Sequence, residues 1–380
     1  MAKTFASGLK LGVLGGGQLG RMLIQAAINL NLAVYVMDPD PNAPCRDIAT
    51  HFQQGVLQDF EAVYAFGKGC DLITIEIEDV NTAALKTLQA EGKTVLPQPD
   101  VIELIQDKRV QKQFYRTHGI PTADFVLTEN RDDLVKHQDF LPAIHKLGKG
   151  GYDGRGVQKI LGLGEIEKGF DAPGVLEKFI DIEKELSVIV ARNAAGESRV
   201  FPAVELVFHP EHNLVEYLFA PAAITDQMQQ DAQHLAGQLI DRLDMVGLLA
   251  VEMFVTQEGQ LLVNEVAPRT HNSGHQTIED NFTSQFEQHL RAILNLPLGA
   301  TDNKIPSAMI NLLGEDGFTG PPIYDGIEEV LAISGASVHL YGKALTKPFR
   351  KMGHVTIIDR DVERLKEKAQ FVKHTLRIIA

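Results

Sequence analysis

Residues 10–38 read KLGVLGGGQLGRMLIQAAINLNLAVYVMD, and this stretch decides the fold of the first part of the chain. A short apolar run ends in glycines, a stretch with helical spacing follows, and a second apolar run closes on Asp38. The order strand, glycine turn, helix, strand predicts a βαβ unit. It therefore predicts a parallel sheet with a right-handed crossover.

The glycines within residues 15–20 match the pattern G-x-G-x-x-G, and Asp38 stands at the end of the next strand, as in dinucleotide-binding folds. Glycines let the backbone approach a ligand closely, and the N-terminus of the following helix attracts phosphate. Three interpretations stay open at this point: a nicotinamide cofactor, a different phosphate ligand, or a tight structural turn. We favour a phosphate ligand that is not a dinucleotide.

Composition and charge narrow the classes of protein. A chain of 380 residues is long enough for two or three domains of roughly 150 residues each. The 36 lysines and arginines against 50 acidic residues give a net charge of −14, which argues against binding to nucleic acid or to an anionic membrane. Cys45 and Cys70 are the only cysteines, as is typical of a reducing compartment, and no apolar run has the length of a membrane span. We expect a cytoplasmic protein.

The remaining pattern predicts a mixed α/β and α+β protein in three parts. We expect short strands at 71–80 and 93–98, and then one helix that has Asp100 as its N-cap and stops at Gly119. Residues 120–220 have the spacing of antiparallel hairpins. Later expected elements are a helix over 226–244 capped by Thr225, a hairpin over 248–266, a helix over 276–295 with Ile278, Phe282, Phe286, Leu290 and Leu294 on one stripe, a strand through 354–359 and a helix over 361–375.

A second glycine-rich loop, Gly148–Gly156, lies between two predicted strands and holds five glycines in nine residues. It is not a Walker A loop, because that loop needs a following helix and a Lys-Ser or Lys-Thr pair. Its backbone N–H groups could fold over phosphates, with Lys146 as a point charge at the end of the preceding strand. We favour a flap that covers a nucleotide over the alternative, a flexible hairpin tip.

The hairpin at 248–266 permits the most geometric prediction. A two-residue turn at Glu258 and Gly259 would place Glu252 opposite Glu265, with their Cβ atoms about 5 Å apart. Two carboxylates at that distance among apolar neighbours repel each other unless they share a proton or hold a cation. With Asn264 beside them, these oxygen ligands suit Mg²⁺ and the phosphates of a nucleotide. The alternative is a pair of solvated strand carboxylates.

Two further stretches favour ligand binding. Residues 267–275, APRTHNSGH, form a polar loop without an evident packing role, and the alternative is a capped connection into the next helix. A basic cluster follows near the end of an acidic chain, which is typical either of a solvated loop or of a local phosphate site. Its members are Lys343, Lys347, Arg350, Lys351 and His354.

Five motifs together resemble the ATP-grasp superfamily, and within it the family of N5-carboxyaminoimidazole ribonucleotide synthases of purine biosynthesis. They are LGVLGGGQLGRML at 11–23, GGYDGRG at 150–156, VEMFVT at 251–256, NEVAPRTHNSGH at 264–275 and RKMGH at 350–354, so the resemblance spans nearly the whole chain. It implies a Rossmann-like N-terminal domain over 1–108, an ATP-grasp domain over 109–298 with a flap lobe at about 120–182, and a small C-terminal domain over 299–380.

The resemblance implies an ATP-dependent carbon–nitrogen ligase. Such an enzyme joins bicarbonate to the exocyclic amine of 5-aminoimidazole ribonucleotide through carboxyphosphate, and it releases ADP and phosphate. The implied partners are ATP, bicarbonate and the ribonucleotide, with Mg²⁺ as cofactor and a second copy of the chain in a homodimer, and neither nucleic acid nor a membrane.

The resemblance also implies site residues by position. ATP would contact Lys108, Lys146, Gly151, Tyr152, Asp153, Gly154, Arg155, Gly156, Val157, Glu177, Lys178, Phe179, Ile180, Glu185, Asn264 and Glu265. The ribonucleotide would contact Gln18, Leu19, Glu78, Tyr152, Asp153, Arg155, Arg269, His271, Asn272, Ser273, Lys343, Arg350 and Lys351, and its ribose phosphate would lie at the first glycine loop. Mg²⁺ would be bound by Glu252 and Glu265. Catalysis would involve Lys146, Asp153, Arg269 and His271, with either His271 or Asp153 as acceptor of the amine proton.

Two other classes of function compete with this one. An NAD-dependent oxidoreductase would explain the first glycine loop and Asp38, but it leaves the flap, the glutamate pair and the basic cluster without a use. A nucleotide-binding regulator without catalytic activity would bind ATP and not turn it over.

Overall fold

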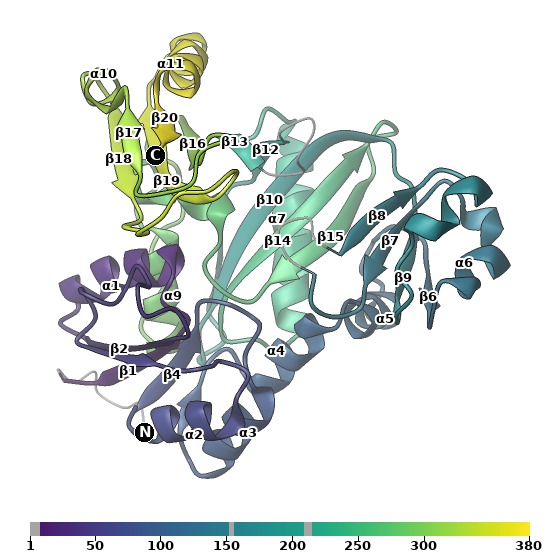
Figure 1. Cartoon of the computed structure of the whole chain (residues 1–380), viewed down its shortest axis with the longest axis horizontal. Coiled ribbons are helices and arrows are strands. Elements are labelled where there is room, and N and C mark those ends of the chain that lie inside the picture. The colour runs from purple at the N-terminus through teal and green to yellow at the C-terminus, as the bar shows by residue number, and fades with distance from the viewer. Residues whose placement is uncertain (1–7, 152–155, 209–214) are drawn as a thin grey trace.

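The structure is a computed structural model that describes residues 8–151, 156–208 and 215–380. Tyr152, Asp153, Gly154 and Arg155 of the predicted flap lie outside the described residues. Figure 1 shows the N-terminal part at the lower left, a small lobe at the right, and the C-terminal segment at the upper left, all arranged around one long sheet.

The first part of the chain is an open parallel sheet with the strand order β3-β2-β1-β4-β5, which confirms the βαβ prediction. The strand order reverses between β1 and β4, and in open α/β sheets ligands bind at the carboxyl ends of strands at such a point. The strands are β1 (Lys10–Leu14), β2 (Ala33–Asp38), β3 (His51–Gln54), β4 (Leu72–Ile75) and β5 (Thr94–Val95), and the helices are α1 (Gln18–Asn29), α2 (Phe60–Lys68), α3 (Thr82–Ala90) and α4 (Pro99–Gln106).

The helix predicted after Asp100 is wrong in two respects. It begins at Pro99, and it is broken at Asp107, where the backbone is extended (φ −116°, ψ 106°). The Asp107 carboxylate accepts a hydrogen bond from the Arg109 N–H at 2.9 Å and so begins a second helix, α5 (Lys108–His118). An aspartate at an N-cap satisfies N–H groups that have no partner within the helix. The break places Lys108 at the first position of α5.

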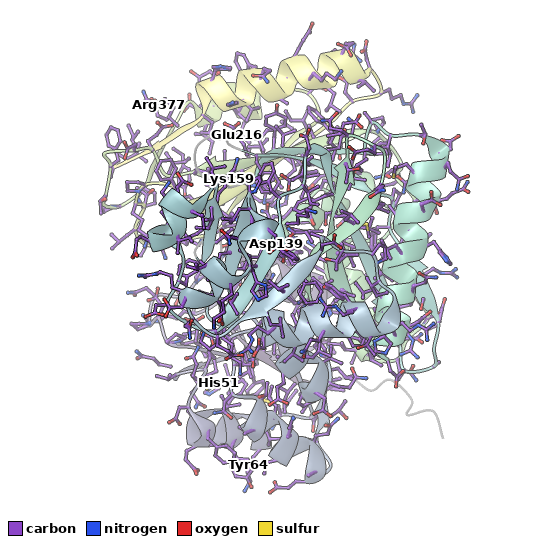
Figure 2. The ribbon with its side chains drawn as sticks, turned by 90° about the vertical axis from the view of Figure 1, so that its right-hand side faces the viewer. His51, Tyr64, Asp139, Lys159, Glu216 and Arg377 are labelled. Atoms are coloured by element: carbon purple, nitrogen blue, oxygen red, sulfur yellow. The ribbon has the colours of Figure 1, made fainter. Side chains whose placement is uncertain are left out.

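A four-stranded antiparallel sheet with the order β6-β9-β7-β8 forms the small lobe. Turned by 90°, Figure 2 shows this lobe, marked by Asp139 and Lys159, in front of the long sheet. Its elements are β6 (Phe125–Thr128), α6 (Asp132–Lys136), η1 (Gln138–Phe140), β7 (Ala143–Leu147), β8 (Val157–Ile160), η2 (Leu163–Lys168) and β9 (Gly174–Lys178). The predicted strand–loop–strand around the second glycine-rich loop is confirmed by β7 and β8.

The long sheet is antiparallel, with the order β15-β14-β10-β12-β13-β16-β19-β18 and with β11 paired to β10. Because β13 pairs with β16, the sheet continues without a break into the C-terminal segment. Its strands are β10 (Ile182–Arg192), β11 (Ser198–Val200), β12 (Val204–Phe208), β13 (Val215–Ala220), β14 (Gly247–Thr256), β15 (Leu261–Ala267), β16 (Ser307–Leu313), β18 (Ala336–Leu340) and β19 (Lys351–Ile358). A two-stranded sheet pairs β17 (Ile323–Asp325) with β20 (Arg377–Ile379).

The helices of the second half partly follow the predictions. Thr225 caps α7 (Asp226–Arg242) through a hydrogen bond from the Met228 N–H, as predicted. The single helix over 276–295 is wrong, because Ser284 caps a new helix and Phe282 is 65% exposed in the gap. The remaining helices are η3 (Asn272–Gly274), α8 (Thr277–Asp280), α9 (Gln285–Ile293), α10 (Ile327–Leu331) and α11 (Val362–Thr375).

Packing joins the N-terminal sheet to the rest. Phe286 and Leu290 of α9 share one buried core with Leu23 of α1 and Leu11 of β1, and Figure 1 shows α1 and α9 side by side. Burial of such side chains contributes roughly 1.5–3 kcal/mol each. The glycine loop before α1 is therefore held against the central part. Among the described residues no helix has the length and apolar character needed to cross a bilayer.

Candidate active site

Strands β14 and β15 place Glu252 opposite Glu265 as predicted, but by a different route. Near the turn the register differs by one residue from the predicted one, because Thr256 pairs with Gln260 around a three-residue loop. A β-bulge at Asn264 then restores the predicted pair. Since two residues of a bulged strand oppose one residue of its partner, both Asn264 and Glu265 stand across from Glu252.

Lys108 and Lys146, both predicted to contact ATP, approach the side-chain oxygens of Glu265 and Asn264 from different elements. Lys108 Nζ of α5 lies 2.5 Å from Glu265 Oε2. Lys146 Nζ of β7 lies 2.9 Å from Asn264 Oδ1 and 3.0 Å from Glu177 Oε2. The small lobe, α5 and the hairpin therefore meet at one cluster of charges, which we call the lysine–carboxylate cluster: Lys108, Lys146, Glu177 and Glu265, with Asn264 beside them. A polyanionic ligand requires such an arrangement of charged side chains.

The two glutamates of the hairpin differ in their protonation. The Lys108 ammonium holds the pKa of Glu265 below its usual range. Burial, and next to it the charge of Glu265, raises the pKa of Glu252. Without a bound cation, the repulsion predicted between them is therefore relieved by a proton on Glu252 and by Lys108 on Glu265.

The donor set fits Mg²⁺. Glu252, Glu265 and Asn264 offer only oxygen atoms, and a divalent cation would displace the proton of Glu252. No three His, Cys, Asp or Glu side chains within the described ranges form a metal site by themselves. The other ligands would therefore have to be water and phosphate oxygens, as is usual for Mg²⁺ bound with a nucleotide.

Glu177, from the predicted ATP-binding stretch 177–180, belongs to this cluster, and Glu185 lies near it. Along β9 the side chains alternate, so Glu177 faces the lysines whereas Lys178 is exposed. Phe179 is also exposed, and its N–H donates to the Pro142 carbonyl. Burial raises the pKa of Glu185 on β10 to about 7.

The first glycine loop is already occupied by carboxylates of the chain. The Gly16 N–H donates to Asp38 Oδ2 at 2.7 Å, and the Gly17 and Leu19 N–H groups donate to the two oxygens of Glu76 at 2.8 and 3.0 Å. A phosphate at these N–H groups would compete with two carboxylates. A dinucleotide or a phosphate could bind this backbone only by displacing these carboxylates, so the phosphate site at this loop stays a prediction.

Glu76 is a residue that our sequence reasoning missed. It follows the last residue of β4, the strand adjacent to β1, so its carboxylate reaches the N-terminus of α1 directly. A strand over 71–80 would have hidden this, but β4 ends at Ile75. The available signal was a carboxylate at the end of the neighbouring parallel strand, where helix N-termini attract anions.

The structure brings predicted ribonucleotide-binding residues together from three distant segments. Lys343 Nζ lies 2.7 Å from Gln18 Oε1 and 2.6 Å from the carbonyl oxygen of Lys351. Arg269 Nη2 lies 2.9 Å from Glu78 Oε1. The N-terminal loops, the polar loop and the basic cluster therefore line one region.

His271 links this region to the hairpin. Its Nε2 lies 3.6 Å from Glu252 Oε1, and its Nδ1 lies 2.9 Å from Ser273 Oγ. Asn272 and Asn311 exchange two amide hydrogen bonds of 2.8 and 3.0 Å. The prediction that the polar loop has no packing role is wrong: the Asn272 and Ser273 side chains are buried and support the loop.

Three predicted residues are placed differently from the rest. Leu19 packs its side chain in the core. Arg350 Nη1 donates to the Leu345 carbonyl within its own loop. His354, assigned above to the basic cluster, is fully buried and stacks on two other histidines.

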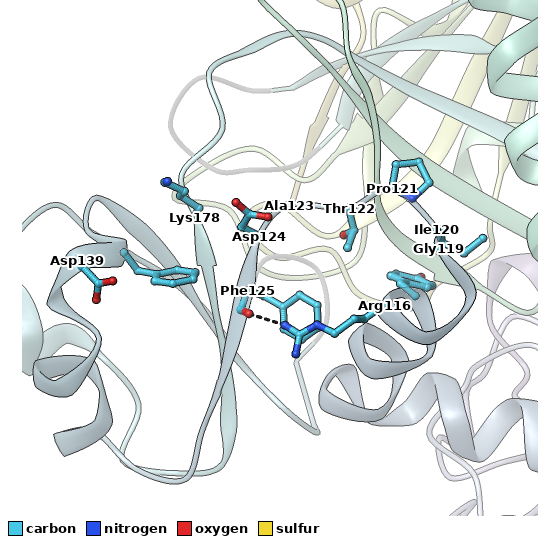
Figure 3. A pocket seen from close by; sticks show the side chains of 12 residues that line it. Arg116, Gly119, Ile120, Pro121, Thr122, Ala123, Asp124, Phe125, Asp139 and Lys178 are labelled. Carbon is cyan, nitrogen blue, oxygen red and sulfur yellow. Dashed lines mark hydrogen bonds between the residues drawn. The ribbon is translucent and has the colours of Figure 1, made fainter.

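A cavity of about 510 Å³ lies away from this cluster, at the junction of the small lobe with α5. Figure 3 shows Asp139, Asp124 and Lys178 around it, and Arg116 donating to the Phe125 carbonyl. Among the described residues that line it, Lys178 is the one predicted site residue, and none of the lining residues belongs to the charge cluster.

Three family models match successive parts of the chain. The ribonucleotide synthetase preATP-grasp domain matches residues 9–106, the ATP-grasp domain matches residues 113–286, and the phosphoribosylaminoimidazole carboxylase C-terminal domain matches residues 307–368.

Individual relatives agree with these models. A phosphoribosylaminoimidazole carboxylase of Candida glabrata is 37% identical over 378 residues, which cover 95% of this chain but only 65% of that protein. The crystal structure of N5-carboxyaminoimidazole ribonucleotide synthetase from Thermotoga maritima is 43% identical with a TM-score of 0.90, and the match covers 98% of this chain and 99% of that chain. The Aspergillus clavatus synthase, solved with ADP and 5-aminoimidazole ribonucleotide, is 35% identical with a TM-score of 0.88 and coverages of 96% and 98%. The chain therefore belongs to the N5-carboxyaminoimidazole ribonucleotide synthetase family of ATP-grasp ligases.

Proposed function

We propose that this chain carboxylates the exocyclic amine of 5-aminoimidazole ribonucleotide with bicarbonate and ATP, and releases N5-carboxyaminoimidazole ribonucleotide, ADP and phosphate. One observation carries the proposal: His271, 3.6 Å from Glu252, joins the lysine–carboxylate cluster to the region where three segments bring cations together. The ADP and ribonucleotide bound to the Aspergillus relative support the same pair of ligands.

The lysine–carboxylate cluster would bind ATP. Lys108 and Lys146 are held by Glu265, Asn264 and Glu177 before any nucleotide arrives, so their charges need little reorganisation on binding. Transfer of the γ-phosphoryl group to bicarbonate depends mainly on positioning and on neutralising negative charge. The flap at 151–157 would close over the product carboxyphosphate and exclude water.

Glu252 and Glu265 would hold Mg²⁺, which supplies positive charge to the phosphoryl oxygens when bound. Glu252 has to lose its proton before it can act as a ligand. His271 Nε2, at 3.6 Å from Glu252 Oε1, is placed to take that proton.

The second substrate would lie among residues from the three segments. Arg269, Lys343 and Lys351 would attract bicarbonate, carboxyphosphate and the phosphate of the ribonucleotide. The Glu78 carboxylate can accept a hydrogen bond from an amine and so orient it towards the carboxyl donor. For the amine proton we retain His271 and Asp153 as alternative acceptors.

The proposal includes the wider expectations for this family. The division into 1–108, 109–298 and 299–380 is supported by the separate ranges of the three family models. We further propose a homodimer working in the cytoplasm, and sedimentation of the purified chain tests the dimer directly.

ADP release tests the proposed activity, measured in the complete mixture and with ribonucleotide, bicarbonate or Mg²⁺ omitted in turn. We expect full release only in the complete mixture, together with incorporation of labelled bicarbonate into the ribonucleotide. Release that needs neither bicarbonate nor ribonucleotide would contradict the proposal. Binding of ATP without any release would favour the regulator class instead.

A further inference from the structure

Lys112 is a buried cation that the proposed function leaves without a role. It stands one turn after Lys108 on α5, so both side chains project from the same face of the helix. Its side chain is 2% exposed, and its Nζ lies 3.1 Å from Glu177 Oε1 and 2.5 Å from Thr122 Oγ1. A buried ion pair is a weak source of net stability, because desolvation offsets much of the attraction. Stability alone therefore does not explain this lysine.

Glu177 is shared between two lysines. Its Oε1 faces Lys112 at 3.1 Å and its Oε2 faces Lys146 at 3.0 Å. Burial alone would raise the pKa of Glu177, but Lys146 and Lys112 lower it below its usual value, so the carboxylate stays ionised. Two ammonium groups on one carboxylate leave an excess of one positive charge, next to the place where phosphates are expected.

Lys112 itself remains mostly charged near neutral pH. Burial lowers its pKa to about 8, and Glu177 opposes that shift, whereas Lys146 and Lys108 add to it. The Tyr115 ring lies 5.7 Å from its Nζ on the same helix. Lys112 can therefore compete with Lys146 for Glu177.

The anchor of Lys112 also connects it to the hairpin. Thr122 accepts a hydrogen bond from Lys112 and donates one to the Val263 carbonyl at 2.7 Å. The Val263 N–H in turn donates to the Pro121 carbonyl. Val263 precedes Asn264, which is the other partner of Lys146. The Lys112 ammonium group, which projects from α5, thus contacts β9 through Glu177 and supports β15 through Thr122. These are the elements that meet at the cluster.

We propose that Lys112 is a positioning residue for phosphoryl transfer: by holding one oxygen of Glu177, it prevents that carboxylate from binding Lys146 as an exclusive partner. Lys146 then stays between Glu177 and Asn264, with its charge available to the transferred group. Lys112 does not touch the nucleotide in this scheme. The inference rests on the proposed function, because it takes Lys146 to face ATP.

A double-mutant cycle over Lys112 and Glu177 tests this role, with kcat for ADP release and the KM for ATP measured for each variant. We expect Lys112→Met to lower kcat at least tenfold while the KM for ATP changes less than threefold, because Lys146 is drawn onto Glu177. Lys112→Arg should retain kcat within threefold of the wild type. In the Glu177→Gln background, Lys112→Met should change kcat less than twofold, since the carboxylate it competes for is gone.

Lys368→Met is the matched control, since Lys368 Nζ pairs with Asp359 Oδ2 at 2.8 Å in the C-terminal segment. It should lower the melting temperature and leave kcat unchanged. A Lys112→Met enzyme with wild-type kcat, or losses that multiply in the double mutant, would overturn the proposal. Where Lys112→Met alone is too unstable to purify, Lys112→Gln takes its place in all arms of the cycle, with the same expected outcomes. A wild-type chain that releases no ribonucleotide-dependent ADP would instead overturn the proposed function.

Discussion

Two buried groups of ionisable side chains in this molecule, the Lys112–Glu177 pair and a stack of histidines, are kept in opposite states. At the lysine–carboxylate cluster, Glu177 stays ionised because Lys112 lies 3.1 Å from one of its oxygens and Lys146 lies 3.0 Å from the other, and Lys112 stays mostly charged beside it. In a histidine stack between the polar loop and β19, His354 lies between His339 and His275, with ring centroids 4.4 and 4.7 Å away. Burial lowers the pKa values of His275 and His354 well below the usual value, so these rings are neutral.

The difference shows two ways in which a fold can tolerate buried polar groups. Paired charges suit a site that must receive a polyanion, since a ligand can replace part of the pairing. The neutral rings of His275 and His354 hold two parts of the fold together through packing. Within the described part of the chain, His339 is the one member of the stack with a carboxylate partner, Glu279, at 2.7 Å. The first region should therefore respond to mutation through activity, and the second should respond to pH through stability.

The largest effect is expected when the pairing of the cluster is broken at Glu265. Glu265→Gln leaves Lys108 without its carboxylate, so it should melt below the wild type and lose ADP release by a factor of about 100 or more. Glu252→Gln should also lose activity, but it should melt near the wild type, because Glu252 carries a proton when no cation is bound. Calorimetry and the ADP assay measure both. Equal melting of the two variants would contradict the unequal protonation of the pair.

A second test within the cluster removes the cation that faces Asn264. Lys146→Ala should reduce ATP affinity or turnover at least tenfold, about 1.4 kcal/mol. It should leave the protein folded, because Glu177 keeps Lys112 as a partner. Titration with ATP and steady-state kinetics check this expectation. Unchanged affinity and turnover would mean that the lysine–carboxylate cluster is structural, like the histidine stack.

The histidine stack should make the protein sensitive to acid. His275 and His354 are neutral in the folded chain but take up protons below about pH 6.5 when unfolded, so the unfolded state binds more protons and stability is lost as the pH falls. Each of the two rings should lower the free energy of unfolding by up to about 1.4 kcal/mol for every pH unit below 6.5. Urea unfolding between pH 5 and 7.5 measures this slope. The free energy of unfolding of the His354→Asn variant should depend less steeply on pH than that of the wild type. The same slope in both proteins would mean that the stack is charged in the folded chain.

The smallest effect is expected at Arg350, whose guanidinium contacts its own loop. Arg350→Ala should raise the KM for the ribonucleotide about threefold and leave the KM for ATP unchanged, if this residue contributes charge to the phosphate of the ribonucleotide. An equal rise in both constants would indicate a disturbed loop, and no rise would remove Arg350 from the site.

Three site predictions made from the sequence show why such prediction succeeded only in part. The pairing of Glu252 with Glu265 was predicted from a two-residue turn, and it is correct only because the bulge at Asn264 compensates for a three-residue loop. The glycine loop was predicted to bind phosphate through its N–H groups, and Glu76, which follows another strand, already accepts hydrogen bonds from two of them. His354 was assigned to the basic cluster because it is near in sequence, whereas the stack buries it. Each error concerns which partner a group finds.

What the sequence alone determined is local. Apolar periodicity and capping act over a few residues, so β1, α1, β2, the two strands of the hairpin and the Thr225 cap were all predicted correctly. Only the tertiary structure decided which charges meet. Lys108 reaches Glu265 across 157 residues, and Lys343 reaches Gln18 across 325. Coulomb and hydrogen-bond energies depend on distances of a few ångströms. These distances are set by how separate sheets pack, and no local pattern carries that information.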